Sequence, residues 1–485
     1  MPLMPCRPTP CLPAPCPARD SPIHHGGLRR TFALTAALLL CSAASATVET
    51  DPGTEVLSTS GSAGLGLNLR LSTSPYRDVA SYLDLMPLYL YEGERVFLRS
   101  GQIGLKLLAG PVHRFDVLID KRLEGFPLKD RPDSLTGMAL RGPATDAGLS
   151  YRYVQPRGTL QVQALRDISS GHGGSEVRVG YGADWQSGNW QLRPSVTLAW
   201  RDSKLNDYYY GVRPGEATAS RPSYSAGAGF NTTVALDASY AVSHGWRLLG
   251  GVSVTLLPHS ITDSPVVGRG VLPSVYVGAA YDFGAPNRPL FESGSPTIVK
   301  ALYGKSTEDG CHLVKILTAQ CFATSSTNAT HIAGVQIGRP FIQNFNGWPI
   351  DLSAHFGLTH HDDRGLQRNG LQADAFLKAT YSAFPWSERV ATRIGLGVGL
   401  SLAQRAPYIE ASSQAGQGEL SSRLLTFLDP TVDVSVGDLT GVRSLKNTFL
   451  GVGVSHRSGI FATSRLLGKV DGGSNYIYTY VESAF

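Results

Sequence analysis

The chain has 485 residues, of which 42% are hydrophobic and 17% are charged, and its formal net charge is +5. A balance so close to neutral gives no electrostatic case for binding nucleic acid. No apolar run approaches the ~20 residues that a membrane-spanning helix needs, so any membrane segment must be a strand.

The chain begins with a pattern that is typical of secreted proteins. Residues 28–46 combine two arginines, an apolar stretch and the small-residue ending Ala44-Ser45-Ala46. This pattern predicts a signal peptide that is cleaved after Ala46, and we interpret residues 1–46 as an N-terminal extension and signal peptide. Removing it leaves 39 basic and 37 acidic residues, because it takes four of the 43 basic and one of the 38 acidic residues.

Short segments of alternating apolar and polar residues follow, separated by Gly, Pro, Asn and Asp clusters. Alternation at period two is typical of barrel strands with one side facing lipid and the other facing the lumen. The predicted strands of the first half are Gly64–Leu71, Arg95–Leu108, Leu149–Val154, Thr159–Arg166, Glu176–Trp185, Trp190–Trp200, Asn231–Tyr240, Trp246–Leu257 and Leu272–Phe283.

The last of these strands has the pattern of a barrel terminus. Apolar residues from Val275 to Ala279 fall at period two, and the pattern stops on the aromatic Phe283. Such an ending is typical of the final strand of an outer-membrane β-barrel. We therefore predict that residues 47–284 form a complete barrel, whose last strand closes onto the first strand near Gly64.

A proline-bounded linker, residues 285–298, precedes a second series of alternating segments. The chain ends on a second barrel-type strand, in which Ile477, Val481 and Phe485 share one face. Residues 299–485 are therefore predicted to form a second barrel module. Its predicted strands include His331–Gly338, Ile350–Thr359, Leu371–Ser382, Arg389–Leu402, Thr431–Asp438, Thr448–His456 and Asn475–Phe485.

Two of the six cysteines remain after the signal peptide is removed, Cys311 and Cys321. They lie ten residues apart around a turn-like segment, and in an oxidising periplasm two cysteines at that spacing favour a disulfide. A metal pair is less favoured because no further ligands stand beside them, apart from His312.

The whole pattern predicts an all-β protein made of antiparallel transmembrane β-barrels. We expect two barrels in tandem, with about ten strands before the linker and about eight after it, since even numbers close a bacterial barrel without an edge. A single barrel of about 18 strands is the rival architecture. A secreted pair of β-sandwiches is the soluble alternative, in which the two aromatic endings would be accidental.

Residues ~60–284 resemble the MipA/OmpV family of outer-membrane proteins. The resemblance rests on landmarks that occur in order rather than on any single motif. These landmarks are Ser74-Pro75-Tyr76-Arg77-Asp78, Leu85-Met86-Pro87-Leu88-Tyr89, Gly101-Gln102-Ile103-Gly104-Leu105, Gly171-His172-Gly173-Gly174, Trp190-Gln191-Leu192-Arg193-Pro194, Tyr209-Tyr210-Gly211-Val212, Asp263-Ser264-Pro265-Val266-Val267 and Tyr281-Asp282-Phe283.

This resemblance implies an outer-membrane barrel without catalytic residues or a cofactor. For the founding member, the family implies a scaffold that joins a murein hydrolase, a lytic transglycosylase, to a murein synthase. Other members of the family resemble adhesins or proteins of envelope stress. The family usually ends where this chain reaches Phe283, so the second module is a departure from its pattern.

A short motif in the second module resembles the outer-membrane lipid A deacylases. His456 and Ser458 form a His-x-Ser pair at the end of a predicted strand, and residues i and i+2 share one strand face. With the C-terminus in the periplasm, both residues are expected at the extracellular edge, facing outward. There Asp471 is a better third member of a nucleophile–base–orienter set than Glu482, which lies at the far end of the last strand. Gly459 follows the motif where the deacylases have Asn.

Other polar clusters are interpreted as loops. His172 lies in a glycine-rich segment, and we expect it to be exposed on a turn. His360-His361-Asp362-Asp363 could hold a metal, but it precedes Arg364-Gly365 and favours a solvated outer loop. Neither cluster therefore predicts a metal site.

We expect the protein to lie in the cell outer membrane, and three functional hypotheses follow. The leading one is binding or scaffolding linked to murein synthesis and hydrolysis, with a lytic transglycosylase and a murein synthase as partners. The second is hydrolysis of lipid A acyl esters by His456, Ser458 and Asp471, and Arg457 could contact lipopolysaccharide phosphate without catalysis. The third is a passive, porin-like channel.

Overall fold

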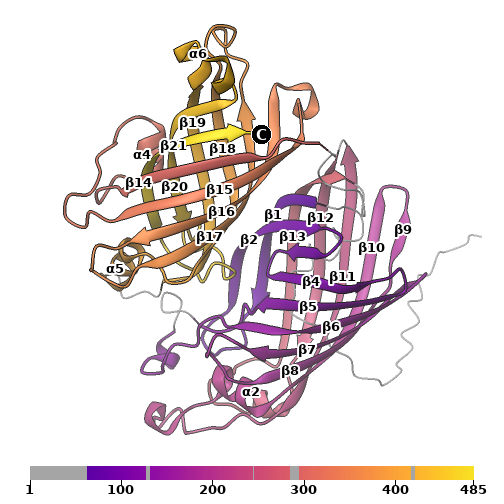
Figure 1. The fold of residues 1–485 in the computed structure, drawn as a ribbon. Coiled ribbons are helices and arrows are strands. Elements are labelled where there is room, and N and C mark those ends of the chain that lie inside the picture. Colours follow the sequence, from indigo (N-terminus) through magenta and orange to yellow (C-terminus); the bar gives the residue numbers. More distant parts are fainter. Residues whose placement is uncertain (1–62, 127–131, 244, 285–293, 417–420) are drawn as a thin grey trace, which may run out of the picture. The chain divides into compact units, whose positions relative to one another are not determined.

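The computed structural model describes residues 63–126, 132–243, 245–284, 294–416 and 421–485 (Figure 1). The predicted signal peptide with its cleavage position at Ala46 and most of the predicted linker lie outside the described residues. Within the described residues, no helix is both long enough and apolar enough to cross a membrane.

The first half of the chain forms a closed antiparallel barrel. Its sheet has 13 strands, of which β9 (Trp185–Ser187) pairs only with β10, and the pairing of β10 with β11 closes the ring. The ring therefore has twelve strands. They are β1 (Ala63–Thr73), β2 (Ser81–Glu92), β3 (Val96–Arg99), β4 (Gln102–Ala109), β5 (His113–Lys121), β6 (Thr145–Gln155), β7 (Gly158–Asp167), β8 (Ser175–Gly182), β10 (Trp190–Arg201), β11 (Gly229–Ser243), β12 (Trp246–Leu256) and β13 (Val271–Gly284).

The expected count of about ten strands was slightly too low. The predicted strand Arg95–Leu108 is a hairpin, β3 and β4, with its turn at Ser100-Gly101. Strands β2 and β5 were not recognised. The predicted closure of the last strand onto the first is confirmed, because Asp282 of β13 pairs with Gly64 of β1.

The second half forms a barrel of its own, so the single large barrel is wrong. Its ring runs from β14 to β21 and closes where β14 pairs with β21. This count agrees with the expected eight. The strands are β14 (Ile298–Ser306), β15 (His331–Ile342), β16 (Ile350–Asp362), β17 (Gly370–Tyr381), β18 (Thr392–Ala403), β19 (Leu424–Ser435), β20 (Thr448–Ser458) and β21 (Gly473–Ala484).

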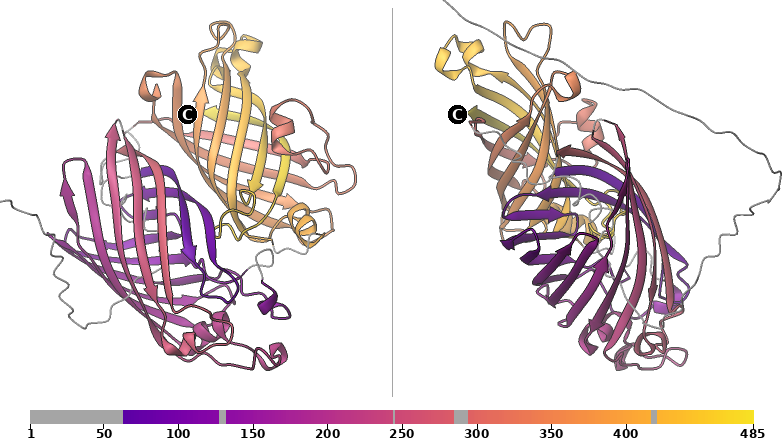
Figure 2. Two further views of the ribbon diagram at one scale, coloured as in Figure 1. Left: turned by 180° about the vertical axis from the view of Figure 1, so that it is seen from behind. Right: turned by 90° about the vertical axis from the view of Figure 1, so that its right-hand side faces the viewer.

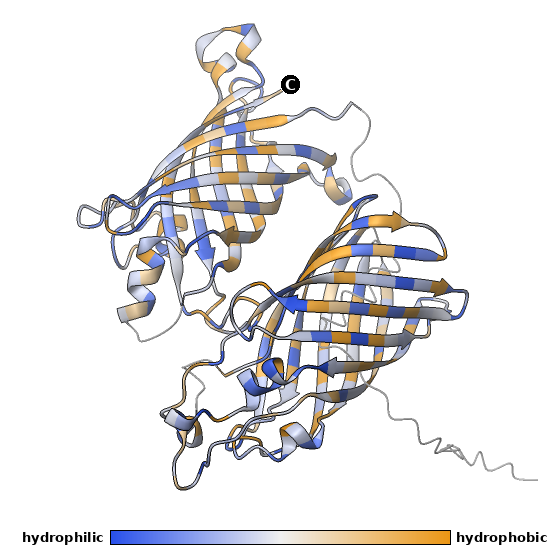
Figure 3. Cartoon of the chain, turned by 60° about the horizontal axis from the view of Figure 1, so that its bottom comes forward, coloured by the Kyte–Doolittle hydropathy of each residue, from blue (hydrophilic) through white to orange (hydrophobic). Residues whose placement is uncertain are grey.

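Hydrophobic and hydrophilic residues alternate along many of the strands, as the colouring of Figure 3 shows. On β13, the side chain of Val277 is 61% exposed, whereas that of its neighbour Tyr276 is 4% exposed. On β21, Tyr478 and Tyr480 point into the lumen and are buried, and Val481 faces outward. An apolar outer face of this kind is what lipid requires. Both predicted barrel endings are thus confirmed as strands with a lipid-type face.

In the first barrel the connections between strands are long at one end and short at the other, apart from the turn Ser100-Gly101 between β3 and β4 (Figure 2). In the second barrel the lengths overlap, since residues 363–369 at one end form a shorter connection than residues 382–391 and 436–447 at the other. The first described strand of each ring begins and its last strand ends at the same end, which in the first barrel is the short-connection end. In outer-membrane barrels the short turns face the periplasm and the long loops face outside. We therefore assign the long connections to the extracellular side. In the first barrel these are residues 74–80, 122–144, 168–174, 202–228 and 257–270.

Candidate functional site

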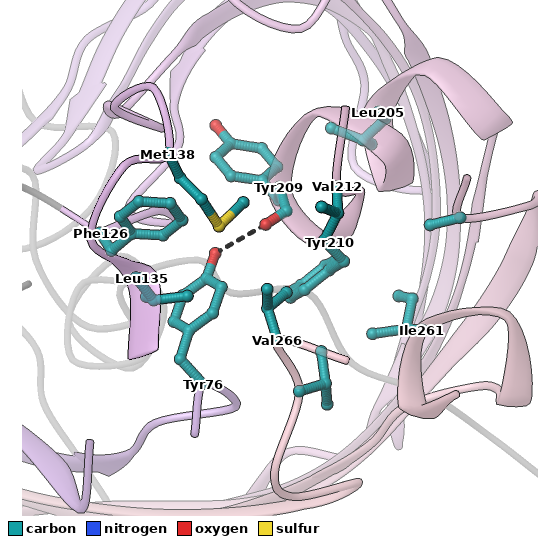
Figure 4. Packing of buried hydrophobic residues seen from close by; sticks show 12 residues of the cluster. Tyr76, Phe126, Leu135, Met138, Leu205, Tyr209, Tyr210, Val212, Ile261 and Val266 are labelled. Carbon is teal, nitrogen blue, oxygen red and sulfur yellow. Dashed lines mark hydrogen bonds between the residues drawn. The ribbon is translucent and has the colours of Figure 1, made fainter. Parts of the chain in front are cut away.

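The long connections of the first barrel fold together into a hydrophobic cap (Figure 4). The Tyr76 hydroxyl donates to the Tyr209 carbonyl at 3.1 Å, and the Tyr76 and Phe126 rings meet edge-on at 5.0 Å. Tyr209 belongs to α2 (Ser203–Tyr210), whose first turn is capped by Asp202 through its bond from the Leu205 amide. The cap residues are Tyr76, Phe126, Leu135, Met138, Leu205, Tyr209, Tyr210, Val212, Ala226, Ile261, Val266 and Val267.

A buried ion pair fixes two of the cap connections to each other. Arg141 donates to the Glu216 carboxylate at 2.7 Å, and the backbone amides of Ala139 and Arg213 donate to the same carboxylate. Burial alone would raise the pKa of Glu216, but these donors outweigh burial and hold the pKa below its usual range. The carboxylate is therefore a charged staple of the cap.

Beneath the cap, arginines and carboxylates cross-link the inner wall of the first barrel. Arg122 pairs with Asp146 and Glu176, and Arg201 pairs with Glu176 as well. These side chains are buried, and each charge faces an opposite charge, which is the arrangement that a buried ionic network needs. The lumen retains a cavity of about 180 Å³, which is lined by Arg193, Arg201, Asp237 and Tyr276 among other residues.

The expectation of an exposed His172 was wrong. Its ring is buried beside the cap, and Nε2 lies 2.9 Å from the Asp146 carboxylate. Asp146, Asp167 and His172 offer ligand atoms within 4.8 Å of one another. However, Asp146 already holds the Arg122 guanidinium, and Asp167 accepts backbone amides of its own turn. The hydrogen bonds of these residues therefore hold the loop that follows β7 in place.

Ionic side chains also fill the second barrel. Lys300 donates to the Asp429 carboxylate at 3.0 Å, and Tyr478 donates to the same carboxylate at 2.5 Å. Closer to the extracellular end, Arg457 donates at 2.7 Å to Glu410 of α5 (Tyr408–Gly416). Eight-stranded barrels have an interior that is just wide enough for side chains. Arg457 therefore lies in the lumen, which corrects the expectation that it could contact lipopolysaccharide.

His456 and Ser458 lie where the sequence predicts them, on the outer face of β20 at its extracellular end. The partner of His456 is Asn475 of β21, whose side-chain oxygen lies 2.7 Å from Nδ1. The Ser458 hydroxyl accepts the Ile460 amide at 3.1 Å. Asp471 lies in the connection between β20 and β21, and its carbonyl accepts a bond from Gln414. Among these described residues, no hydrogen bond joins His456 to Ser458 or Asp471.

The sequence motif did not predict Asn475 as the hydrogen-bond partner of His456. Register pairs it directly with His456 across the β20–β21 ladder. Because 19 residues separate the two positions, their contact can be predicted from the sequence only when the register of β20 on β21 is known.

Cys311 and Cys321 form the predicted disulfide, with Cα atoms 5.7 Å apart. The loop that they close includes α4 (Leu313–Leu317) and packs on Val454 of β20 and Ile477 of β21. Both strand residues face outward. The disulfide loop therefore covers the outer wall next to His456.

Exposed tryptophans stand mostly at the end of each barrel where its first strand begins and its last strand ends, whereas exposed Trp200 stands at the other end of β10. Trp185, Trp190 and Trp246 stand at strand ends of the first barrel, and Trp348 and Trp386 lie in turns of the second. Aromatic girdles are typical of the two membrane interfaces of such barrels. This end therefore has a membrane-interface rim next to its periplasmic turns.

Comparisons with known proteins place the first barrel among outer-membrane proteins. A family model described as MltA-interacting protein MipA matches residues 65–283. The outer membrane protein YiaT of Escherichia coli (strain K12) is 25% identical over 221 residues, which are 45% of this chain and 90% of YiaT. The MltA-interacting protein of the same strain is 24% identical over 225 residues, covering 46% of this chain and 91% of that protein.

A third relative is the outer membrane protein Omp26La of Vibrio anguillarum. It is 30% identical over 155 residues, which are 32% of this chain and 60% of that protein. The family match stops one residue before the end of β13, so the second barrel lies beyond it. Together with the barrel fold, these relatives locate the protein in the outer membrane.

The Glu216 staple predicts an acid-sensitive cap. Folding lowers the pKa of this carboxylate from its usual value of 4.5. The carboxylate therefore stabilises the folded cap fully at a pH above 4.5, and this contribution is lost as the pH falls through the lower pKa of the folded state. Hydrogen exchange at the Ala139 and Arg213 amides, corrected for intrinsic pH dependence, should therefore accelerate only in that acid range. The Glu216→Gln variant should lack this step, and an identical acid step in both proteins would contradict the assignment.

Proposed function

We propose that this chain is an outer-membrane binding protein of murein assembly, because its first barrel matches the family model described as MltA-interacting protein MipA. In this role it anchors a lytic transglycosylase, and through it a murein synthase, to the inner side of the outer membrane. One relative is the MltA-interacting protein of Escherichia coli, and this partner class is taken from that relative. No cofactor takes part.

The observation that carries the proposal is that packed side chains obstruct both lumens, although the first retains a cavity of about 180 Å³. The cap packs over the extracellular mouth of the first barrel, and fully buried Lys300 and Asp429 stand in the middle of the second. A porin needs a water-filled lumen. With the interior committed to packing and ion pairs, the rims remain as the working surfaces, which favours binding over the porin-like alternative.

Murein lies on the periplasmic side, so the short-connection rim is the surface that can meet its enzymes. Within that rim, β9 stands out because all three of its residues are exposed and it pairs only with β10. It forms a small hairpin with the start of β10 through the turn Gly188-Asn189. Exposed Trp185, at the end of β9 farthest from this turn, is the kind of aromatic anchor that concentrates binding energy at interfaces. We therefore assign the partner contact to this hairpin.

Co-purification tests this assignment. Full-length protein extracted from envelopes in mild detergent should retain a lytic transglycosylase, and replacing Trp185 and Gln186 by Ser should abolish retention by removing the anchor. Substituting Arg364 and Leu366 by Ser, in the extracellular turn between β16 and β17, is the matched control and should retain it. Retention by all three proteins would sink the hairpin assignment, and retention by none would sink the partner class.

A second candidate function is hydrolysis of lipid A acyl esters, and it rests on the position of His456. If Nδ1 donates to Asn475, the lone pair on Nε2 is available as a general base. Ser458 would then attack the ester carbonyl and pass its proton to His456. The imidazolium would return that proton to the departing alkoxide, and water would release the fatty acid from Ser458. Asp471 would serve as the orienting group only after displacing Asn475.

Mass spectrometry of lipid A separates this candidate from the first. Cells that express the wild type should lose an acyl chain from lipid A, and cells that express Ser458→Ala should not, because the nucleophile is gone. Asn475→Leu should lower the extent of deacylation by weakening the orientation of His456. An unchanged acylation pattern with the wild-type protein would rule the hydrolase out.

A further inference from the structure

The wall of the first barrel has a notch beside β2. All of β2 from Ser81 to Tyr91 pairs with β1, but only residues from Leu90 to Glu92 pair with β3. The reason is that β3 has four residues, whereas β2 has twelve. The β3–β4 hairpin ends at Ser100-Gly101, partway along the barrel. The extracellular half of β2 therefore has no neighbouring wall strand on this side.

An unpaired strand edge is costly in a membrane, because lipid cannot satisfy backbone donors and acceptors. A barrel that keeps such a notch must fill it with protein. The filling segment here is the connection between β20 and β21, residues 459–472. The amide of Leu85, in the unpaired half of β2, donates to the carbonyl of Thr463 at 2.9 Å.

Side chains of the same connection are buried at the notch. Leu466 is fully buried and packs with Met86 of β2 and with Leu123, which follows β5. Leu466 also lies 3.6 Å from the position that a Cβ on Gly101 would take, at the tip of the short hairpin. The connection thus touches both sides of the notch, β2 and the end of β5.

Arg465 extends this contact into the lumen of the first barrel. It donates to the fully buried Asp84 carboxylate at 2.7 Å and to the Leu123 carbonyl at 3.2 Å. Its guanidinium lies over the Tyr82 ring at 4.8 Å. Arg465 is also among the residues that line the lumen cavity. A buried arginine with a buried carboxylate partner is a specific attachment, since removing either partner leaves the other charge uncompensated.

The backbone of this connection is also strained. Ile460, Phe461 and Ala462 adopt φ values of 54°, 55° and 56°, in the left-handed region that side chains with a Cβ disfavour. Strain of this kind persists only where surrounding contacts impose it, and it clusters at switches and clamps. Bonds within the connection, such as that from the Ala462 amide to the Val470 carbonyl, hold the segment together with the bonds at Leu85 and Asp84.

We propose that residues 459–472 form a lateral plug, by which the second barrel closes an opening between the outer leaflet and the lumen cavity of the first barrel. The opening has lipid-facing Leu83 on its outer side and a polar, arginine-containing cavity on its inner side. An amphiphile with an acyl chain and a polar head has the chemistry that matches both sides. Withdrawal of the strained plug would let such a molecule move between leaflet and lumen.

Cross-linking in the full-length protein tests the contact. A protease site is placed within residues 285–293, and Leu85→Cys is combined with Thr463→Cys. After oxidation and cleavage, the two halves should stay together on a non-reducing denaturing gel and separate on reduction. Leu149→Cys with Thr463→Cys is the matched control, because Leu149 faces outward from β6, and its halves should separate. Separation of the Leu85–Thr463 pair after oxidation would overturn the contact.

Cysteine labelling tests the plug. Met86→Cys is compared in the chain with its own 459–472 segment and in a chain where a short Gly-Ser turn replaces it. A maleimide carried on an acyl chain should label Met86→Cys only in the second chain, whereas exposed Leu83→Cys should be labelled in both. Heat-modifiable migration of both chains controls for folding. Protection of Met86→Cys in both chains would overturn the plug, and equal labelling by a water-soluble maleimide would overturn the amphiphile route.

Discussion

Pairing of backbone groups inside the membrane is the constraint on which the rest of this structure depends. Lipid offers no hydrogen bonds, so every strand in the bilayer must have a neighbour on each side, and only a closed ring provides this. The chain satisfies the requirement twice, once where β13 returns to β1 and once where β21 returns to β14. The short β3 is the one exception that we identify among the described strands, and it coincides with the proposed plug.

Closure also explains where the charges are. Every second side chain of a strand points into the lumen. Charged side chains at these positions pair with one another, so the outward positions can remain apolar and face lipid. In the first barrel these groups form arginine–carboxylate links such as Arg201 to Glu176, and in the second they surround Asp429. Side chains that fill a lumen in this way hinder the flow of water and solutes. We therefore look for binding surfaces on the loops and turns at the ends of the barrels.

The sequence predicted the barrel class, the two endings and the disulfide, because each depends on short-range patterns. Strand β2 escaped recognition because Tyr82, Met86 and Leu88 make its inner face as apolar as its outer face, which removes the alternation. Strand β5 does alternate, with Asp116 and Asp120 facing inward, so its signal was present and was overlooked. Merging β3 with β4 hid the turn that creates the notch.

The candidate sites were harder to predict because their partners are distant in sequence. The glycines around His172 suggested an exposed turn, but Asp146, 26 positions earlier, draws its ring into the wall. The facing of His456 and Ser458 followed from strand parity, whereas the Asn475 contact required the register of β20 on β21. Ion pairs across a lumen, such as Arg457 with Glu410, depend on the curvature of the whole ring.

Two separately closed rings are the central claim, and a disulfide test of the first closure addresses it most directly. Leu69 and Val277 are register partners on the outer faces of β1 and β13. Leu69→Cys combined with Val277→Cys should therefore form a disulfide in the folded, membrane-inserted protein, whereas Leu69→Cys with Val481→Cys on β21 should not. Formation of the Leu69–Val481 link in place of the Leu69–Val277 link would show that β1 closes onto the end of the chain, and would contradict the two-barrel account.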